Sequence, residues 1–396
     1  MRILDVSPKD MTRLESGSAV RTYNLLSQLS RQHSVEQFSL EWAGRLPARS
    51  STRTIVHTST YLEHRYASPL AWSLATIPQH AWLGVPVASG ATLRLARPAP
   101  LDALIRRADA ILVEFPWQFE YCARRAAGAA MVLASHNVER FKFPSWARAA
   151  RIEPQRSMWV RYIARAEANA VARADLIIAV SDSDRGEFIA TYGVDPARVA
   201  VVPNGADTDL YVPADPPTKR DAKKRLDLPN RPTVIFAGAD VPPNRDGLRT
   251  VCEAAARLPD VTFLVIGDVA RPRRDGNLVF TGFVTDLRLH MQAADIALCP
   301  IQYGGGTKIK LLESLAAGLP TVVFEEALKG TAARPGEHVV AADRSADGVA
   351  RAVQALISDT ALAARIGADG RRLVVERYSW GQAARTLADA LEARVR

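Results

Sequence analysis

The chain has 396 residues, of which 48% are hydrophobic and 23% are charged. This length is too great for one ordinary domain and suits two, and the composition excludes a mainly disordered protein. The formal net charge is +9, but no long block of like charges occurs, which argues against a nucleic-acid-binding arm. Cys122, Cys252 and Cys299 lie far apart and form no CxxC pair, so we expect neither a disulfide framework nor a zinc site.

Short runs of β-branched residues alternate with longer amphipathic stretches along most of the chain. In the first half the expected strands are Arg2–Val6, Val35–Leu40, Ala110–Glu114, Ala130–Ala134, Leu176–Val180 and Val199–Val202. In the second half they are Thr233–Ala237, Val261–Ile266, Leu278–Thr281, Ile296–Cys299 and Thr321–Phe324. Helical patterns include Val20–Arg31, Pro154–Arg173 and Ile309–Ala317. Because several strands are nearly continuous apolar runs, we expect parallel sheets covered on both faces, and therefore two doubly wound α/β domains.

The boundary between the two expected domains is a segment without periodic pattern. Pro203–Asp221 is rich in Pro and Asp, as a linker is. Tyr378–Arg396 has the pattern of an amphipathic helix with no strand after it. The expected domains are therefore 1–205 together with the terminal helix 378–396, and 206–377. The N-terminal residues lack the pattern of a signal peptide, so we expect a cytoplasmic protein.

The stretch Tyr66–Leu93 contains no Asp, Glu, Lys or Arg. Prolines interrupt it, so it does not fit a membrane-spanning helix. One interpretation is core packing plus an irregular lid. The other is an apolar surface, carrying Trp72 and Trp82, that meets a lipid-linked acceptor at the inner face of the membrane.

Three consecutive glycines, Gly304, Gly305 and Gly306, follow the strand that ends at Cys299. Glycines allow backbone N–H groups to approach a ligand closely, and a helix that begins just after them directs its positive dipole end to the same place. We expect Thr307 to be the N-cap of that helix. The arrangement suits a diphosphate.

Charged residues follow the glycines. Lys308 and Lys310 add positive charge, and the carboxylate of Glu313 could accept two hydrogen bonds from vicinal ribose hydroxyls. The alternative is a flexible loop before an ordinary core helix.

Four segments of the chain resemble, in order and spacing, the family-4-type retaining glycosyltransferases. Glu313–Pro320 is similar to the second half of their signature, in which two Glu residues are separated by seven others. Gly305 stands where the family has the first Glu, so the contact to the donor sugar is expected to differ, and a GGGT-K branch is the better match. The other three segments are Asp175–Phe188, in which Ser181 would cap a helix, Val201–Tyr211 and Glu376–Leu387.

The resemblance implies the GT-B fold, with two Rossmann-like domains facing across a cleft and a terminal helix crossing back to the first. In the first domain it implies that His136 contacts the donor sugar and polarises the reacting centre, although a structural histidine is the alternative. Glu114 would bind the acceptor or assist acid–base chemistry, unless it is a capping or salt-bridged carboxylate. Gly17, Ser18 and Asn137 would line the acceptor side, where the alternative is a plain strand-to-helix turn.

In the second domain the resemblance implies a donor site around the glycine loop. The family's usual Arg is missing from the loop that contains Gly238, and Arg245 is the nearest substitute. Arg245 and Lys308 would together neutralise the leaving diphosphate, and Asn244 could cap the helix. The donor-binding residues implied by the resemblance are Gly304, Gly305, Gly306, Thr307, Lys308, Glu313, Gly238, Asn204, Phe283 and Val284.

The expected activity is transfer of a sugar from a nucleoside-diphosphate sugar to a hydroxyl acceptor, during assembly of a cell-surface polysaccharide or glycolipid. We expect no metal and no cofactor, and a phosphate oxygen of the leaving diphosphate would take the acceptor's proton. Two alternatives stay open. One is a nucleotide-sugar 2-epimerase, and the other is a sugar-nucleotide-binding protein without transfer activity.

Overall fold

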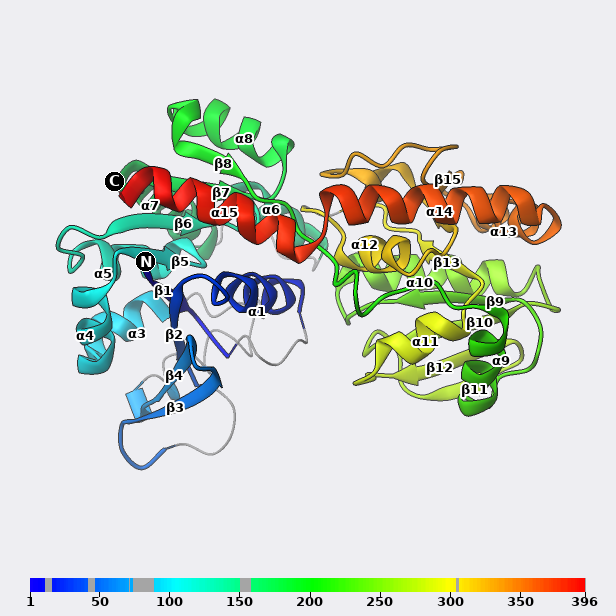
Figure 1. Cartoon of the computed structure of the whole chain (residues 1–396), viewed down its shortest axis with the longest axis horizontal. Helices are drawn as coiled ribbons and strands as arrows, with labels where there is room; N and C mark the ends of the chain where they lie inside the picture. Colours follow the sequence, from blue (N-terminus) through cyan, green and yellow to red (C-terminus); the bar gives the residue numbers. More distant parts are fainter. Residues whose placement is uncertain are drawn as a thin grey trace. The chain divides into compact units, whose positions relative to one another are not determined.

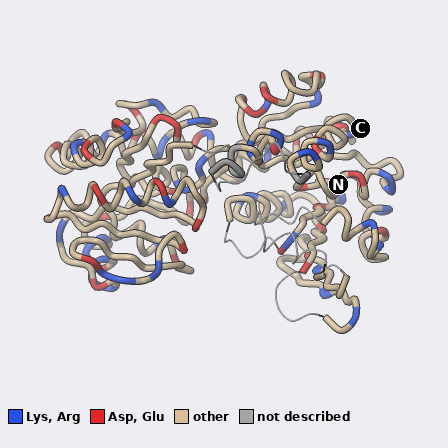
Figure 2. Tube along the Cα trace, turned by 180° about the vertical axis from the view of Figure 1, so that it is seen from behind, with Lys and Arg blue, Asp and Glu red and all other residues tan. Residues whose placement is uncertain are grey.

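The computed structural model describes residues 1–10, 16–41, 47–70, 72–73, 89–149, 158–303 and 306–395. The chain divides into two compact units (Figure 1): Met1–Pro203 together with Ala383–Arg396 form unit 1, and Asn204–Gln382 form unit 2. Lys and Arg residues are interspersed with Asp and Glu along both units (Figure 2).

Unit 1 is built on an eight-stranded sheet. Its strands are β1 (Arg2–Ser7), β2 (Ser34–Leu40), β3 (Ser51–Thr58), β4 (Tyr61–Ala67), β5 (Ala110–Val113), β6 (Ala130–Ala134), β7 (Leu176–Ala179) and β8 (Val199–Val201). The order across the sheet is β3-β4-β2-β1-β5-β6-β7-β8, with only the edge strand β3 antiparallel. The six strands expected in this half are confirmed. The hairpin β3–β4 was not expected, because β3 is mostly exposed and the buried face of β4 includes Glu63, so neither strand is an apolar run.

Helices cover the sheet of unit 1. They are α1 (Gly17–Leu29), α3 (Ser89–Ala96), α4 (Ala99–Arg107), α5 (Pro116–Ala123), α6 (Glu139–Ala149), α7 (Met158–Arg173), α8 (Asp182–Tyr192) and the later part of α15 (Trp380–Val395). Ser181 caps α8 as expected, since its hydroxyl accepts a hydrogen bond from the N–H of Asp184. Most of the uncharged stretch, with Trp82, lies outside the described residues.

Unit 2 is built on a seven-stranded sheet of order β11-β12-β10-β9-β13-β14-β15, in which only the edge strand β11 is antiparallel. The strands are β9 (Thr233–Ala237), β10 (Thr262–Ile266), β11 (Arg273–Asp275), β12 (Leu278–Gly282), β13 (Ile296–Cys299), β14 (Thr321–Val323) and β15 (Val340–Ala341). The helices are α9 (Pro216–Arg225), α10 (Pro242–Ala255), α11 (Leu287–Ala293), α12 (Ile309–Ala316), α13 (Ala346–Ser358) and α14 (Thr360–Arg377). The expected strands are again confirmed, and the two short edge strands were not expected.

The expected linker is shorter than its composition indicated. Helix α9 begins at Pro216, inside the segment Pro203–Asp221, and Asp215 is its N-cap. Proline at the first helical position fits a helix start, because its missing N–H would have no intrahelical partner there. The prolines that we interpreted as linker residues therefore include a helix-start signal.

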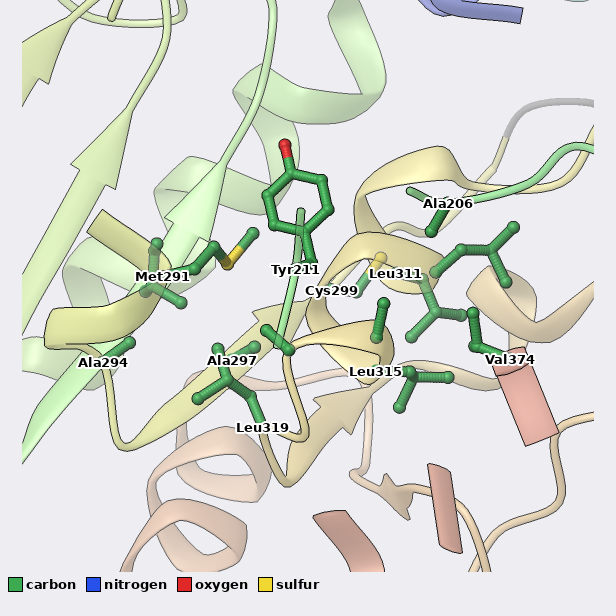
Figure 3. Close-up of a cluster of buried hydrophobic side chains, with 14 of the residues drawn as sticks. Ala206, Tyr211, Met291, Ala294, Ala297, Cys299, Leu311, Leu315, Leu319 and Val374 are labelled. Atoms are coloured by element: carbon green, nitrogen blue, oxygen red, sulfur yellow. The ribbon is translucent and has the colours of Figure 1, made fainter. Parts of the chain in front are cut away.

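Helix α12 is buried almost all round, because every one of its residues except Lys310 is buried. Its leucines pack against the sheet and α14 in a core cluster that includes Cys299, Leu311, Leu315 and Val374 (Figure 3). Burying one leucine side chain stabilises a fold by about 2 kcal/mol. This packing fixes the helix that follows the glycine loop.

Within the described residues, no helix combines the length and the apolarity that crossing a bilayer would need.

Candidate functional site

Each sheet has one place where the strand order reverses. In unit 2, β9 lies between β10 and β13, and in unit 1, β1 lies between β2 and β5. Loops at the carboxyl ends of such neighbouring parallel strands diverge and leave a crevice in which doubly wound folds bind ligands. In unit 2 these loops follow Ala237 and Cys299, and in unit 1 they follow Ser7 and Val113.

The glycine loop follows β13, as expected. Gly304 and Gly305 lie outside the described residues, while Gly306 has a φ of 65°, in the left-handed region that glycine adopts without strain. The prediction that Thr307 is the helix N-cap is wrong. Lys308 is the N-cap of α12 and makes no side-chain capping bond, while the Thr307 hydroxyl donates to the carbonyl of Gly330. A threonine before a helix can equally bind a neighbouring loop, and tertiary packing decides between the two.

Two side-chain hydrogen bonds hold the backbone of this loop. The Asn204 amide nitrogen, which is buried, donates to the carbonyl of Thr307 at 3.0 Å. The Lys308 ammonium donates to the carbonyl of Gly306 at 2.9 Å. Both hydrogen bonds use backbone carbonyls of the loop as acceptors. Asn204, predicted as a donor-binding residue, therefore lies where it shapes the loop through Thr307.

Glu313 is buried, with only 5% of its surface exposed, and its carboxylate pairs with Lys310 at 2.8 Å. The nearby negative charge of Glu313, after the larger effect of burial, raises the pKa of Tyr211. A carboxylate held in place within a buried helix can accept paired hydrogen bonds from vicinal hydroxyls.

The loop after β9 differs from the expectation. Arg245 lies in the first turns of α10 and pairs with Asp240 at 2.5 Å, with both side chains about half exposed. That pairing lowers the pKa of Asp240 and raises the pKa of Arg245. Asn244 is not the helix cap: Val241 is, and the Asn244 amide donates to the carbonyl of Ala239. The structure thus shows Arg245 with an acidic partner that the sequence pattern did not indicate.

Gly238 belongs to a crowded backbone crossing. A Cβ on Gly238 would lie 3.0 Å from the Asn244 side chain, and a Cβ on Gly267 would lie 2.1 Å from the carbonyl oxygen of Gly238. Gly238, a predicted donor-binding residue, therefore lies in close backbone contact with Gly267. Its role toward a ligand stays a prediction.

Tyr303 is a residue of this region that the sequence analysis missed. Its hydroxyl donates to Asp246 of α10 at 2.7 Å, which links the start of the glycine loop to α10. Two predicted donor-side residues lie after β12: Phe283 is 60% exposed, whereas Val284 packs against the core.

In unit 1, parallel strands bring two predicted residues into contact. Glu114 follows β5 and His136 follows the neighbouring strand β6, and the His136 Nε2 atom lies 2.5 Å from the Glu114 Oε2 atom. The Thr22 hydroxyl of α1 donates to the same oxygen at 2.9 Å. Burial, joined by the charges of Arg21 and Lys142, lowers the pKa of His136 well below its usual range, while burial raises the pKa of Glu114. The imidazole is therefore neutral at pH 7, and its buried Nε2 atom lies beside the Glu114 carboxyl group without a hydrogen bond to any described residue.

Asp5 is a second residue that the sequence analysis missed. It is fully buried in β1, and its pKa is raised well above the usual range by burial and by the neighbouring Glu114. The Ser7 hydroxyl and the Gln37 amide donate to its Oδ1 atom. An acidic residue inside the otherwise apolar run Arg2–Val6 was the signal that could have identified it.

The predicted acceptor-side residues follow strands of the unit 1 sheet: Gly17 and Ser18 begin α1, and Asn137 lies between β6 and α6. Gly17 is the first residue of α1 and is exposed, and the hydroxyls of Ser18 and Ser16 lie 3.1 Å apart. The Asn137 carbonyl accepts a hydrogen bond from the Ser135 hydroxyl. Within the described ranges, no group of three or more His, Cys, Asp or Glu side chains is placed to hold a metal ion.

Comparison with known proteins identifies the family. A model described as Glycosyltransferase Family 4 matches residues 16–210, and one described as Glycosyl transferases group 1 matches residues 231–359. The alpha-maltose-1-phosphate synthase of Mycolicibacterium smegmatis (strain ATCC 700084 / mc(2)155) is 30% identical over 293 residues, covering 65% of this chain and 71% of that relative. The chain belongs to the group 1 glycosyltransferase family.

A further relative of this group 1 family member is a GDP-mannose-dependent alpha-(1-6)-phosphatidylinositol monomannoside mannosyltransferase of Mycobacterium tuberculosis (strain ATCC 25618 / H37Rv). The two are 32% identical over 241 residues. The match covers 55% of this chain and 61% of that relative, which is less than two thirds of the relative's length.

Solved structures share the fold of this group 1 family member. Sucrose-phosphate synthase from Thermosynechococcus elongatus aligns with a TM-score of 0.77 at 18% identity, covering 99% of this chain and 98% of that chain. Anabaena HepE, solved in complex with UDP and glucose, aligns with a TM-score of 0.72 at 16% identity, covering 99% and 100%. At these identities the similarity concerns the fold alone, which is the expected GT-B type.

Proposed function

We propose that the protein is a retaining glycosyltransferase that moves a sugar from a nucleoside-diphosphate sugar to a hydroxyl acceptor. The observation that carries the proposal is the buried Glu313 on α12 directly after the Gly306–Lys308 turn, in a chain that belongs to the group 1 family. Helix α12 thereby holds both a carboxylate that can bind ribose hydroxyls and an N-terminus that can bind phosphates.

The donor's diphosphate would lie at the glycine loop of unit 2. Backbone N–H groups near Gly306, the α12 N-terminus and the Lys308 ammonium supply the positive potential that a departing diphosphate needs. An ammonium group carries three N–H donors and can contact phosphate oxygens as well as the Gly306 carbonyl. These groups support a reaction without a metal ion, and no cofactor is proposed.

The hydroxyl acceptor would lie at the carboxyl edge of the unit 1 sheet, near His136. With its Nε2 atom directed at Glu114, 2.5 Å away, the neutral imidazole would use Nδ1 to bind a sugar hydroxyl. In the proposed step the acceptor oxygen bonds to the anomeric carbon while the bond from that carbon to the phosphate oxygen breaks on the same face. The acceptor's proton passes to a phosphate oxygen, so the products are the glycoside and the nucleoside diphosphate.

The relatives indicate the substrate class that we propose. One relative is named for GDP-mannose and a phosphatidylinositol monomannoside, and the fold neighbour HepE was solved with UDP and glucose. We propose a hexosyl donor and an acceptor in cell-surface polysaccharide or glycolipid assembly. We further propose a cytoplasmic protein that contacts the membrane through residues 66–93.

The first experiment is a thermal-shift panel of UDP, GDP, ADP, UDP-glucose and GDP-mannose on wild type and Glu313→Ala. One nucleotide should stabilise the wild type, by about 2.7 kcal/mol at a hundredfold excess over Kd, and Glu313→Ala should lose this response. The control Glu376→Ala, an exposed glutamate of α14, should keep it. If no nucleotide stabilises the wild type, the proposed donor site is wrong.

A second assay separates transfer from mere binding. The nucleotide sugar chosen by the panel is incubated in water without acceptor, and release of the nucleoside diphosphate is followed. Slow release supports a glycosyltransferase. Tight binding with no release would instead support the sugar-nucleotide-binding alternative.

A further inference from the structure

One buried carboxylate of unit 1 binds the turn that carries His136. Glu167 of α7 is only 1% exposed. Its two oxygens accept hydrogen bonds from the backbone N–H groups of Glu139, at 2.7 Å, and Arg140, at 2.9 Å. The Tyr192 hydroxyl of α8 donates to the same carboxylate at 2.6 Å.

The two backbone groups are the first of helix α6, which begins at Glu139, three residues after His136. The first N–H groups of a helix have no intrahelical acceptor and must bind something else. Here a carboxylate from another helix accepts two of them, which also places negative charge at the positive end of the α6 dipole. Figure 1 shows α6, α7 and α8 in unit 1.

The turn is held at its other end as well. The Ser135 N–H donates to the carbonyl of Ile178 at 3.0 Å, just after β6. His136 therefore lies between two fixed points, β7 on one side and Glu167 on the other. Loss of the contact to β7 or of the contact to Glu167 would move the buried imidazole relative to Glu114.

We infer that Glu167 is a positioning residue that sets the orientation of the His136 imidazole by holding the start of α6. This inference rests on the proposed function, in which His136 acts on the sugar. Burying a carboxylate is unfavourable unless the carboxylate accepts hydrogen bonds. Burial raises the pKa of Glu167 to about 7. The three hydrogen bonds stabilise the charged form of the buried carboxylate. Two of them also fix the start of α6.

The test compares Glu167→Gln with Glu63→Gln. A glutamine amide accepts one backbone N–H through its oxygen but presents an NH₂ group to the other, so the start of α6 should shift. Glu63 is the matched control, because it is a buried, hydrogen-bonded carboxylate of the same unit on the distant strand β4. Both variants should lose stability, and only Glu167→Gln should affect the turn.

The first readout is release of nucleoside diphosphate from UDP-glucose or GDP-mannose. Glu167→Gln should lower kcat by about 10- to 100-fold, the range expected for a slightly misplaced catalytic group, while KM for the donor changes less than about twofold. Tyr192→Phe, which leaves both backbone contacts in place, should stay near the wild-type rate. A Glu167→Gln loss no larger than that of Glu63→Gln, or an equal loss in Tyr192→Phe, would overturn the inference.

The second readout is the pH profile of kcat. The groups that face Glu167 are Glu139 and Arg140 on α6 and Tyr192 on α8. As the pH falls through about 7, the carboxylate gains a proton and loses acceptor capacity, so the wild-type rate should fall. Glu167→Gln should lack this acidic limb. An unchanged limb in the variant would contradict the inference.

The third readout does not depend on turnover. Histidine-labelled protein gives imidazole NMR signals, and the His136 signal is identified by its loss in His136→Asn. It should shift in Glu167→Gln and stay in place in Glu63→Gln, and no shift in Glu167→Gln would overturn the inference. If the wild type turns over neither nucleotide sugar, the proposed function fails, and this spectrum alone decides whether Glu167 positions His136.

Discussion

At the scale of single residues, unit 1 buries two neighbouring carboxyl groups, Asp5 and Glu114, beside the neutral His136. Two carboxyl groups this close and this far from water do not both ionise, so the pair retains a proton. Glu114 accepts a hydrogen bond from the Thr22 hydroxyl and lies near the positive charge of Arg21, and both favour its ionised form. Asp5 is then the group that holds the proton, in keeping with its raised pKa.

The variant Asp5→Asn tests this arrangement. Because the pKa of Asp5 is raised in the folded state, the wild type should lose stability as the pH rises from about 4, the value of an exposed Asp, through the raised value. Asparagine can accept from Ser7 and Gln37 and donate to Glu114 without titrating. Urea unfolding gives the free energy of unfolding of both proteins at pH 5 and pH 9. Relative to the wild type, the variant should be more stable at pH 9 than at pH 5. An equal difference at the two pH values would contradict the shared proton.

At the scale of elements, the first residues of unit 2 are hydrogen-bonded to the residues at the start of α15. The Ala206 N–H donates to the Tyr378 carbonyl at 2.7 Å, and the Trp380 N–H donates to the Ala206 carbonyl at 3.3 Å. Gly205 lies against the Trp380 ring, where an added Cβ would meet the Cδ2 atom and the backbone nitrogen at 2.9 Å. The close approach requires a residue without a side chain.

Gly205→Ala should therefore destabilise unit 2 by about 1–3 kcal/mol, the usual effect of overpacking. Gly186→Ala is the matched control, since Gly186 lies within α8 and its Cβ would meet nothing within 4 Å. That substitution should stabilise unit 1 by about 0.5–1 kcal/mol through helix propensity. Denaturant titrations give both values, and equal effects of the two substitutions would refute the packing argument.

At the scale of the whole molecule, the C-terminal part of α15 completes a unit that begins at residue 1. Ala383–Arg396 belong to unit 1, where Arg394 donates to the Ala197 carbonyl and Leu391 is fully buried. The fold of unit 1 thus depends on residues at both ends of the sequence, which is a large loop to close during folding.

Leu391→Ala should open a cavity in unit 1 and destabilise it by about 2–5 kcal/mol. Hydrogen exchange should show weaker protection of the amides of β1 and β5 and unchanged protection of those of β9 and β13. Val395→Ala, a partly exposed position on the same helix, should change neither. Weaker protection confined to unit 2 would contradict the prediction that the C-terminal part of α15 stabilises unit 1.

Several features of this molecule could be read from local pattern. The apolar runs that became β5, β9 and β13 were identified within a residue or two, because strands buried on both faces need continuous apolar sequence. The positions of Glu114, His136 and the glycine loop followed, because parallel strands place their carboxyl ends at one edge. The cap of α8 by Ser181 was equally local.

Other features depended on contacts between distant segments, which no local pattern encodes. Thr307 binds Gly330 and does not cap α12, Arg245 pairs with Asp240, and Asp5 lies beside Glu114 only because β1 and β5 are neighbours in the sheet. The sequence by itself determined which residue types lie at the ends of the strands, since burial and periodicity act over a few neighbouring residues. Only the tertiary structure decided which partners those residues bind and which protons they hold, because hydrogen bonding and burial depend on what the fold brings beside them.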